Sequence, residues 1–218
     1  MTSDSLVYIE TGAAVPQHTF IWLHGLGANG YDLQPFAESL AGSGCGGIRQ
    51  VFPHAPYRHL DLYGDAPIRA WYRFDERGFG RGENENDIHG SIEQIEELLL
   101  RERQALPKPG KLILGGFSQG GVIALAAGLT GRIRVDGIVA LSAYYWEDDI
   151  PASRHPPVFM GHGDTDAVIP LAIGYRSAKK LKHHGIAIDW HEYPMAHSIC
   201  NAEIDDLSLW LKIRLTNL

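Results

Sequence analysis

Short runs of apolar and β-branched residues alternate along this chain with longer stretches in which apolar residues recur every three or four positions. The first pattern predicts strands, and the second predicts helices that bury one face. On this basis we expect strands at residues 6–10, 19–23, 47–52, 111–115, 137–142, 157–161 and 187–193. We expect helices between them, at 33–40, 88–106, 119–129, 171–183 and 199–215.

Several of the expected strands are apolar at successive positions rather than at every second one. Uninterrupted apolar strands are typical of a parallel sheet with helices over both faces. The alternation of strand and helix also favours parallel strands, because each helix serves as a right-handed crossover. The pattern therefore predicts an α/β fold with a mostly parallel twisted sheet flanked by helices on both faces. No linker-like segment divides the chain, so we expect one domain that spans residues 1–218.

Residues 53–87 sustain neither period and are rich in proline, glycine and aromatic residues. Loops of this length in compact domains are usually functional or disordered, and this one is too apolar for disorder. We expect it to be a long loop that folds over a substrate pocket. The helix that follows is predicted to begin near Asp87 as its N-cap and to stop at Pro107.

The charge of the chain limits its partners. Its 26 acidic and 19 basic side chains leave a formal charge of −7, which provides no basic surface for nucleic acid. No apolar run approaches the ~20 residues that span a bilayer, so no integral membrane association is expected. The first residues lack the basic and apolar regions of a signal peptide, and we therefore expect a soluble cytoplasmic protein.

Cysteine and histidine give no metal pattern. Cys45 and Cys200 are the only cysteines and form no CxxC pair, so both are expected to be reduced thiols. Among the 11 histidines, the nearest candidate for a metal site is the segment HGDTD at 162–166. No HExxH motif or pair of histidines at helical spacing accompanies it. We expect neither a metal nor a cofactor.

The segment GFSQG at 116–120 fits the pattern GxSxG. It follows the expected strand 111–115 and enters the expected helix 119–129, which is the setting of a nucleophile elbow. Glycines two positions before and after Ser118 allow the backbone to turn sharply. Ser118 is therefore a candidate nucleophile, and the alternative is a flexible turn without chemistry.

A serine hydroxyl needs an imidazole to take its proton and a carboxylate to orient that imidazole. In α/β-hydrolases the acid and then the histidine follow the serine, on loops after later strands. Here the strand 157–161 leads into a loop with Asp164 and Asp166, and the strand 187–193 leads into a loop with His197. His197 is the candidate base, and on sequence alone the two aspartates compete for the orienting position.

Four segments together resemble the acyl-protein thioesterase and small carboxylesterase (phospholipase/carboxylesterase) family of α/β-hydrolases: LHGLG at 23–27, GGFSQGG at 115–121, HGDTD at 162–166 and MAHS at 195–198. The resemblance spans almost the whole chain and implies the α/β-hydrolase fold. It also implies Ser118 as nucleophile, Asp166 as the orienting carboxylate and His197 as base. Asp166 ranks above Asp164 because the catalytic aspartate of the family motif is the second one.

The transition state of acyl transfer also needs two N–H groups aimed at the developing oxyanion. One is expected from Gln119, the residue after the nucleophile, and the other from the loop after strand 19–23. The resemblance points to Leu26 in that loop. For the substrate pocket we expect four residues: Trp71 by the resemblance, Tyr72 beside it, Tyr144 at the carboxyl end of a strand, and Val168.

The chain departs from the family pattern in two places. Ala167 stands where the family usually has proline, and the segment RAWYR at 69–73 replaces a Ser-Trp-Tyr/Phe-Asp segment. The second departure brings Arg69 and Arg73 near the expected pocket and alters its charge.

These patterns predict a serine hydrolase that cleaves carboxylic esters or thioesters of small molecules through an acyl-enzyme. A carboxylesterase of short to medium acyl chains is favoured, with a lysophospholipase or an acyl-protein thioesterase (depalmitoylase) as the alternative. A ligand-binding protein without turnover would require a degraded catalytic position, and none is degraded. The protein is expected to be a monomer or homodimer.

Overall fold

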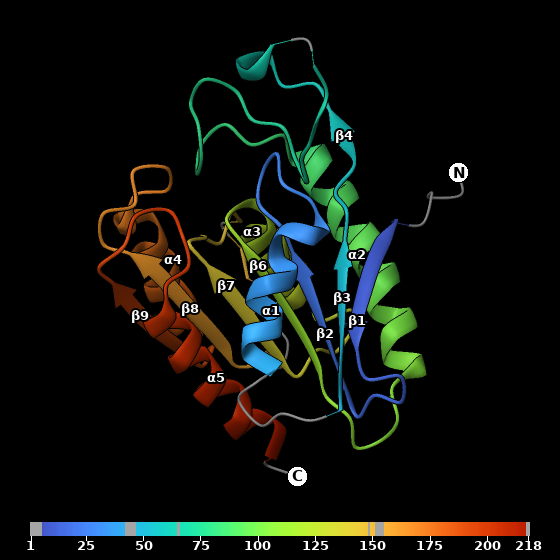
Figure 1. The fold of residues 1–218 in the computed structure, drawn as a ribbon. Coiled ribbons are helices and arrows are strands. Elements are labelled where there is room, and N and C mark those ends of the chain that lie inside the picture. The colour runs from blue at the N-terminus through green and yellow to red at the C-terminus, as the bar shows by residue number, and fades with distance from the viewer. Residues whose placement is uncertain (1–5, 42–46, 65, 148, 151–154, 217–218) are drawn as a thin grey trace.

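The computed structural model describes residues 6–41, 47–64, 66–147, 149–150 and 155–216. Its centre is a seven-stranded sheet in the order β1-β3-β2-β6-β7-β8-β9 (Figure 1). β1 is antiparallel to β3, and the other neighbouring strands are parallel. The prediction of a mostly parallel sheet is thereby confirmed. The bounds are β1 Tyr8–Gly12, β2 His18–Leu23, β3 Ile48–Pro53, β6 Leu112–Phe117, β7 Gly137–Leu141, β8 Val158–Gly163 and β9 Ile188–Tyr193, each within two residues of the expected ends.

Helices cover both faces of this sheet (Figure 1). α1 (Gln34–Ala41) and α5 (Asn201–Thr216) share one core cluster with Phe20 and Trp22 of β2. α2 (Glu85–Ala105), α3 (Gln119–Leu129) and α4 (Leu171–His183) share the other cluster with Ile21 and Leu23. Successive strand residues point to opposite faces, so an uninterrupted apolar strand supplies both clusters. The fold class is therefore confirmed.

The start of α2 differs from the prediction. Its N-cap is Asn84, whose side chain accepts a hydrogen bond from the N–H of Asp87 at 3.1 Å. Asp87 is instead buried inside the first turn, where its carboxylate pairs with Arg58 at 2.8 Å and with Arg73 at 2.7 Å. The arginines are provided by the preceding segment, so local capping preferences could not reveal the true role of Asp87.

The segment between β3 and α2 is more ordered than the expected loop. It contains β4 (Tyr57–Arg58) paired antiparallel with β5 (Ile68–Arg69), and the short helix η2 (Asp61–Tyr63). Residues 73–84 then form a hairpin: the N–H of Asn84 donates to the carbonyl of Arg73 at 2.8 Å, and that of Asp75 donates to Gly82 at 3.0 Å. We call this element the Phe79 hairpin. The whole segment rises above the carboxyl ends of the parallel strands (Figure 1).

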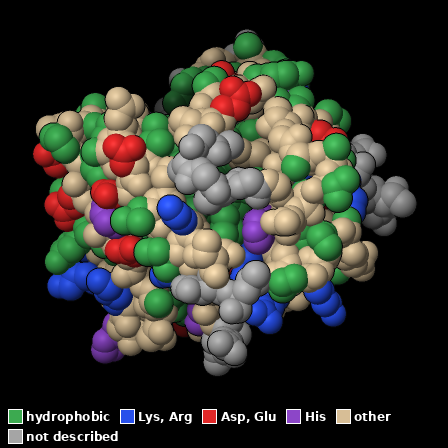
Figure 2. Space-filling view, turned by 60° about the horizontal axis from the view of Figure 1, so that its bottom comes forward, with side chains coloured by type: hydrophobic (Ala, Val, Ile, Leu, Met, Phe, Trp, Pro, Cys, Tyr) green, Lys and Arg blue, Asp and Glu red, His purple; other side chains and the backbone are tan. Residues whose placement is uncertain are grey.

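On the face that Figure 2 shows, lysine and arginine side chains lie in separate groups among hydrophobic and polar ones. In the described part of the chain, no helix is both long and apolar enough to cross a membrane. Cys200 is a free cysteine, and Cys45 lies outside the described residues.

Candidate active site

Ser118 occupies a strained turn between β6 and α3. Its backbone angles are φ 55° and ψ −122°, in a region that side-chain-bearing residues rarely adopt. The flanking glycines are required by close packing: a Cβ at Gly120 would overlap the carbonyl of Leu23, and one at Gly116 would overlap the backbone of Gly120. The turn therefore has the strand-turn-helix form of a nucleophile elbow.

Asp166 and His197 are brought together from the loops after β8 and β9. Nδ1 of His197 donates to Oδ2 of Asp166 at 2.7 Å. The other carboxylate oxygen accepts from the N–H groups of Val168 at 2.9 Å and Ile169 at 2.8 Å. Because a carboxylate only accepts, this bond places the proton on Nδ1 and leaves Nε2 free to act as a base.

Asp164, the competing aspartate, is exposed and makes no hydrogen bond or ion pair with His197 among the described contacts. Its backbone N–H donates to the carbonyl of Tyr193 at 2.9 Å, and the N–H of Thr165 donates to Met195 at 3.2 Å. These bonds tie the loop after β8 to the loop that carries His197. The tie turns the side chain of Asp166, not that of Asp164, towards the imidazole.

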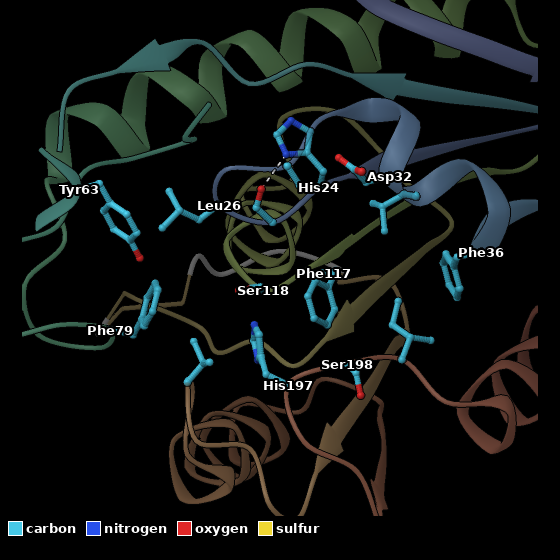
Figure 3. A pocket seen from close by; sticks show the side chains of 15 residues that line it. His24, Leu26, Asp32, Phe36, Tyr63, Phe79, Phe117, Ser118, His197 and Ser198 are labelled. Atoms are coloured by element: carbon cyan, nitrogen blue, oxygen red, sulfur yellow. Dashed lines mark hydrogen bonds between the residues drawn. The ribbon is translucent and has the colours of Figure 1, made fainter. Parts of the chain in front are cut away.

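Ser118 and His197 line the same cavity, and the His197 ring points from its loop towards Ser118 (Figure 3). The ring of Phe117, the residue before Ser118, packs against His197 with a centroid distance of 4.8 Å. No hydrogen bond between Ser118 Oγ and His197 occurs among the described contacts. Such bonds often tighten only when substrate binds.

A second histidine, His162, lies behind Asp166. Its Nε2 donates to the carbonyl of Ile169 at 2.8 Å and lies 3.5 Å from Oδ2 of Asp166. Burial lowers the pKa of His162, so the neutral ring supports the acid loop. The sequence suggested this residue only as a metal ligand. Among the described residues, no group of three or more His, Cys, Asp or Glu side chains is placed to hold a metal.

The N–H groups of Leu26 and Gln119 have no hydrogen-bond partner among the described residues. Leu26 lies in the turn after β2, and Gln119 is the first residue of α3. Both flank Ser118, and the first N–H groups of a helix are free to bind an anion. This arrangement could stabilise an oxyanion beside the serine.

His24 holds the turn that carries Leu26. Its Nδ1 donates to the carbonyl of Gly25 at 2.7 Å, and its Nε2 accepts from the N–H of Ala55 at 3.0 Å. Burial lowers the pKa of His24 to about 4. At neutral pH the imidazole is therefore uncharged, which keeps one nitrogen available as the acceptor that this geometry requires.

Trp71 and Tyr72 brace the elbow from behind rather than line the pocket. The side chain of Gln119 accepts from the N–H of Trp71 at 2.8 Å and donates to the carbonyl of Tyr72 at 2.6 Å. The indole Nε1 of Trp71 donates to the carbonyl of His24 at 2.9 Å. Trp71 and Tyr72 are fully buried in the core, as is Tyr144, and none of the three lines the cavity. This corrects their expected role as pocket residues, because all three rings are covered by other parts of the chain and present no surface to the cavity.

The cavity in front of Ser118 has a volume of about 530 Å³. Val168, expected in the pocket, lines it and is half exposed. The segment 53–87 contributes Tyr63 and Phe79 (Figure 3). No sequence pattern marks these two residues as pocket residues, because residues 53–87 sustain neither a strand nor a helix period. The other apolar lining side chains are Leu26, Ala28, Leu33, Phe36, Phe117 and Ile199.

The two arginines of the unusual RAWYR segment do not line the cavity. Arg69 donates to the carbonyl of Ala55 at 2.7 Å and lies over the ring of Tyr57, 4.3 Å from its centroid. Arg73 is paired with Asp87. Both guanidinium groups therefore stabilise the segment instead of charging the pocket.

Comparison with known proteins agrees with this geometry. The phospholipase/carboxylesterase family, an α/β-hydrolase family, matches residues 5–215. Acyl-protein thioesterase 1 of Saccharomyces cerevisiae is 32% identical over 219 residues, covering 92% of this chain and 94% of that protein. The chain belongs to the phospholipase/carboxylesterase family.

Solved structures show the same likeness. The crystal structure of acyl-protein thioesterase 2 from Zea mays has a TM-score of 0.81 and 25% identity, and the match covers 96% of this chain and 99% of that one. The crystal structure of esterase PE8 has a TM-score of 0.84 and 26% identity, with 97% and 100% covered. Both are hydrolases by name, which agrees with the site described above.

Proposed function

We propose that this protein is a serine hydrolase that cleaves carboxylic esters or thioesters through an acyl-enzyme. The observation that carries the proposal is the elbow serine in a cavity shared with the hydrogen-bonded pair of Asp166 and His197. A candidate nucleophile, a base and an oriented carboxylate from three separate loops are the components of a catalytic triad, and this supports the proposal.

In the first half of the reaction, Ser118 Oγ attacks the carbonyl carbon of the substrate and His197 Nε2 takes the hydroxyl proton. The N–H groups of Leu26 and Gln119 stabilise the oxyanion of the tetrahedral intermediate. Asp166 holds the imidazole in its tautomer and stabilises the imidazolium. Collapse of the intermediate breaks the bond to the alcohol or thiol, which leaves with the proton from His197.

In the second half, water attacks the acyl-serine and gives a proton to His197. The new tetrahedral intermediate breaks the bond to Ser118, which recovers its proton from the imidazole. The carboxylic acid leaves, and the chain returns to its starting protonation state. Every proton is carried by His197, so the proposed steps require no cofactor.

The preferred substrates are small-molecule esters with short to medium acyl chains. The apolar lining of the cavity favours an acyl chain, and each buried CH₂ contributes up to about 0.8 kcal/mol of binding. Phe79, which Figure 3 shows at the cavity, and Val168 both line the site and add apolar surface to it. A thioesterase acting on acylated proteins is the second candidate, supported by the names of the relatives.

Two measurements test the assignment. A fluorophosphonate probe should label the parent protein on Ser118, and Ser118→Ala should abolish both labelling and ester turnover. Ser198→Ala, which removes another hydroxyl from the same cavity, should leave the labelling in place. Labelling at any other residue, or turnover in Ser118→Ala close to that of the parent, would contradict the proposal.

The choice of substrate class needs a panel of acyl esters and matched thioesters from two to sixteen carbons (roughly the range that a cavity of this kind samples). A maximum of kcat/KM at short to medium esters would support the carboxylesterase. A maximum at palmitoyl thioesters would favour the acyl-protein thioesterase instead. The cytoplasmic location and the monomeric or homodimeric state stay predictions from the sequence.

A further inference from the structure

A buried phenol connects the Phe79 hairpin to the core. Tyr144, which follows β7, donates its hydroxyl proton to the carboxylate of Glu83. The same hydroxyl oxygen accepts from the N–H of Gly80 at 3.0 Å and lies 3.4 Å from the hydroxyl of Tyr72. Gly80 also donates to Glu83. Tyr144 thus binds the hairpin at two points after Phe79: at Gly80, the next residue, and at Glu83 in the returning arm.

The other links of the hairpin to the body of the protein lie at its two ends, which join α2, and in the packing of Phe74 and Phe79 against the apolar core. Among the described hydrogen bonds and ion pairs, only those of Tyr144 connect residues 74–83 to a segment outside the hairpin. The remaining bonds, such as those between Arg77 and Asp75, lie within it. Phe79 stacks on Phe74 with a centroid distance of 4.6 Å, which is again a contact inside the hairpin.

The position of the hairpin affects the cavity through Phe79, which lines the cavity in front of Ser118 (Figure 3). The position of Phe79 depends on the hairpin, and the hairpin is joined to the core next to Phe79. We propose that Tyr144 is a specificity-determining residue: its hydroxyl latches the hairpin so that Phe79 closes one side of the cavity and limits the acyl chains that fit. This inference rests on the proposed ester hydrolysis.

The hydrogen bond between the Tyr144 hydroxyl and the Glu83 carboxylate is expected to be stable. Burial raises the pKa of the Tyr144 hydroxyl above its ordinary value, so the group keeps its proton and remains a donor. Its acceptor is a carboxylate, and hydrogen bonds to charged groups are stronger than neutral ones. The loss of the hydroxyl should therefore increase the open population of the hairpin by about ten-fold or more.

The neighbouring tyrosine provides a matched control. Tyr145 is also buried, and its hydroxyl also donates to a carboxylate, that of Glu147, at 2.9 Å. Neither Tyr145 nor Glu147 lines the cavity or contacts the hairpin through a described hydrogen bond. Tyr145→Phe therefore removes the same atom from the same kind of environment without touching the latch.

The first test measures hairpin opening without any substrate. Arg77 and Arg81 are exposed on the hairpin and are potential trypsin sites. Native-state trypsin cleavage there should be about ten-fold faster in Tyr144→Phe than in the parent. Tyr145→Phe should match the parent, and Glu83→Gln, which keeps an acceptor oxygen, should stay closer to the parent than Glu83→Ala. Equal cleavage rates in Tyr144→Phe and Tyr145→Phe would overturn the latch.

The second test measures specificity. The ratio of kcat/KM for dodecanoyl over acetyl p-nitrophenyl ester should rise in Tyr144→Phe, by about the same factor as in Phe79→Ala. In the double variant Tyr144→Phe/Phe79→Ala this ratio should rise no further than in either single variant, because both substitutions open the same side of the cavity. An unchanged ratio in Tyr144→Phe would overturn the specificity role. If the parent hydrolysed none of the esters, the proposed function would fail, while the trypsin comparison would still decide whether Tyr144 latches the hairpin.

Discussion

The indole N–H of Trp71 donates to the carbonyl of His24 at 2.9 Å and so connects the segment before α2 to the turn that carries Leu26. The backbone N–H of the same tryptophan donates a hydrogen bond to the side-chain oxygen of Gln119. One core residue thus contacts both loops whose N–H groups flank Ser118. Its buried ring supports the site from behind and does not face the cavity.

Trp71→Phe should therefore reduce turnover of acetyl and octanoyl esters by the same factor. Loss of one neutral hydrogen bond weakens the support of the Leu26 turn by about 1 kcal/mol, which corresponds to a roughly five-fold lower kcat/KM. Steady-state kinetics on the two esters measure this ratio. Trp146→Phe is the control, because the indole nitrogen of Trp146 is buried and has no hydrogen-bond partner in the described part of the chain. A lower kcat/KM for the octanoyl ester alone would contradict this and indicate that Trp71 contacts the acyl chain in the pocket.

Replacement of Asp166 and replacement of Asp164 by asparagine should lower kcat by very different factors. Asp166→Asn replaces the acceptor of the His197 proton by an amide and favours the wrong tautomer, so kcat should fall by about 10³-fold to 10⁴-fold, as in other serine hydrolases. Asp164→Asn should change kcat by less than about three-fold, since surface substitutions are usually mild. Circular dichroism should show both variants folded. Equal losses would mean that Asp164 shares the orienting role.

Glu203 should make stability depend on pH. This carboxyl of α5 is completely buried next to Gly161, and neither oxygen has a hydrogen-bond partner among the residues that the structure describes. Burial raises its pKa from 4.5 to about 8. Between these two values the folded protein holds a proton that the unfolded chain has lost, so rising pH favours unfolding. The contribution of Glu203 falls by roughly 1.4 kcal/mol for each pH unit in that window, before any relaxation of the site.

Glu203→Gln is the test of this dependence. The amide resembles the protonated carboxyl, so the variant should match the parent near pH 4.5 and exceed its free energy of unfolding increasingly towards pH 8. Urea denaturation at several pH values measures the difference. Glu192→Gln, on exposed surface, is the control and should produce no such divergence. Parallel curves for Glu203→Gln and the parent would show that Glu203 is ionised in the folded protein.

Chelation should leave ester turnover unchanged, because every proposed step uses side chains and backbone groups of the chain itself. Activity after dialysis against EDTA should equal that of an untreated sample. A loss that added zinc restores would contradict the proposal and direct attention to His162 and the aspartates of its loop.

Local patterns in the sequence were sufficient for the architecture. The strands and helices are encoded by periods of two to four residues, and each predicted strand lies within two residues of its observed place. The GxSxG pattern can also be read locally, although Gly120 is required by its contact with the carbonyl of Leu23, which is distant in the sequence. The family resemblance then ordered the candidate residues, including the preference for Asp166.

The tertiary structure decided which side chains face one another. That Asp166 rather than Asp164 meets His197 depends on hydrogen bonds between the loops after β8 and β9, which no local pattern encodes. From sequence alone, an aromatic residue near the site can equally line the pocket or lie in the hydrophobic core. Trp71 and Tyr144 proved to be core because partners far away in the chain, Gln119 and Glu83 among them, occupy their polar atoms.

The same reasoning explains why Phe79 emerged only from the structure. The sequence indicates a hydrophobic residue in a glycine-rich stretch, which by itself has no preferred neighbour. Its place at the cavity follows from the closure of residues 73–84 into a hairpin and from the bond between that hairpin and Tyr144. Short-range preferences determine what a segment can become, whereas a pocket is formed where segments distant in sequence pack together, and that packing minimises the free energy of the whole chain at once.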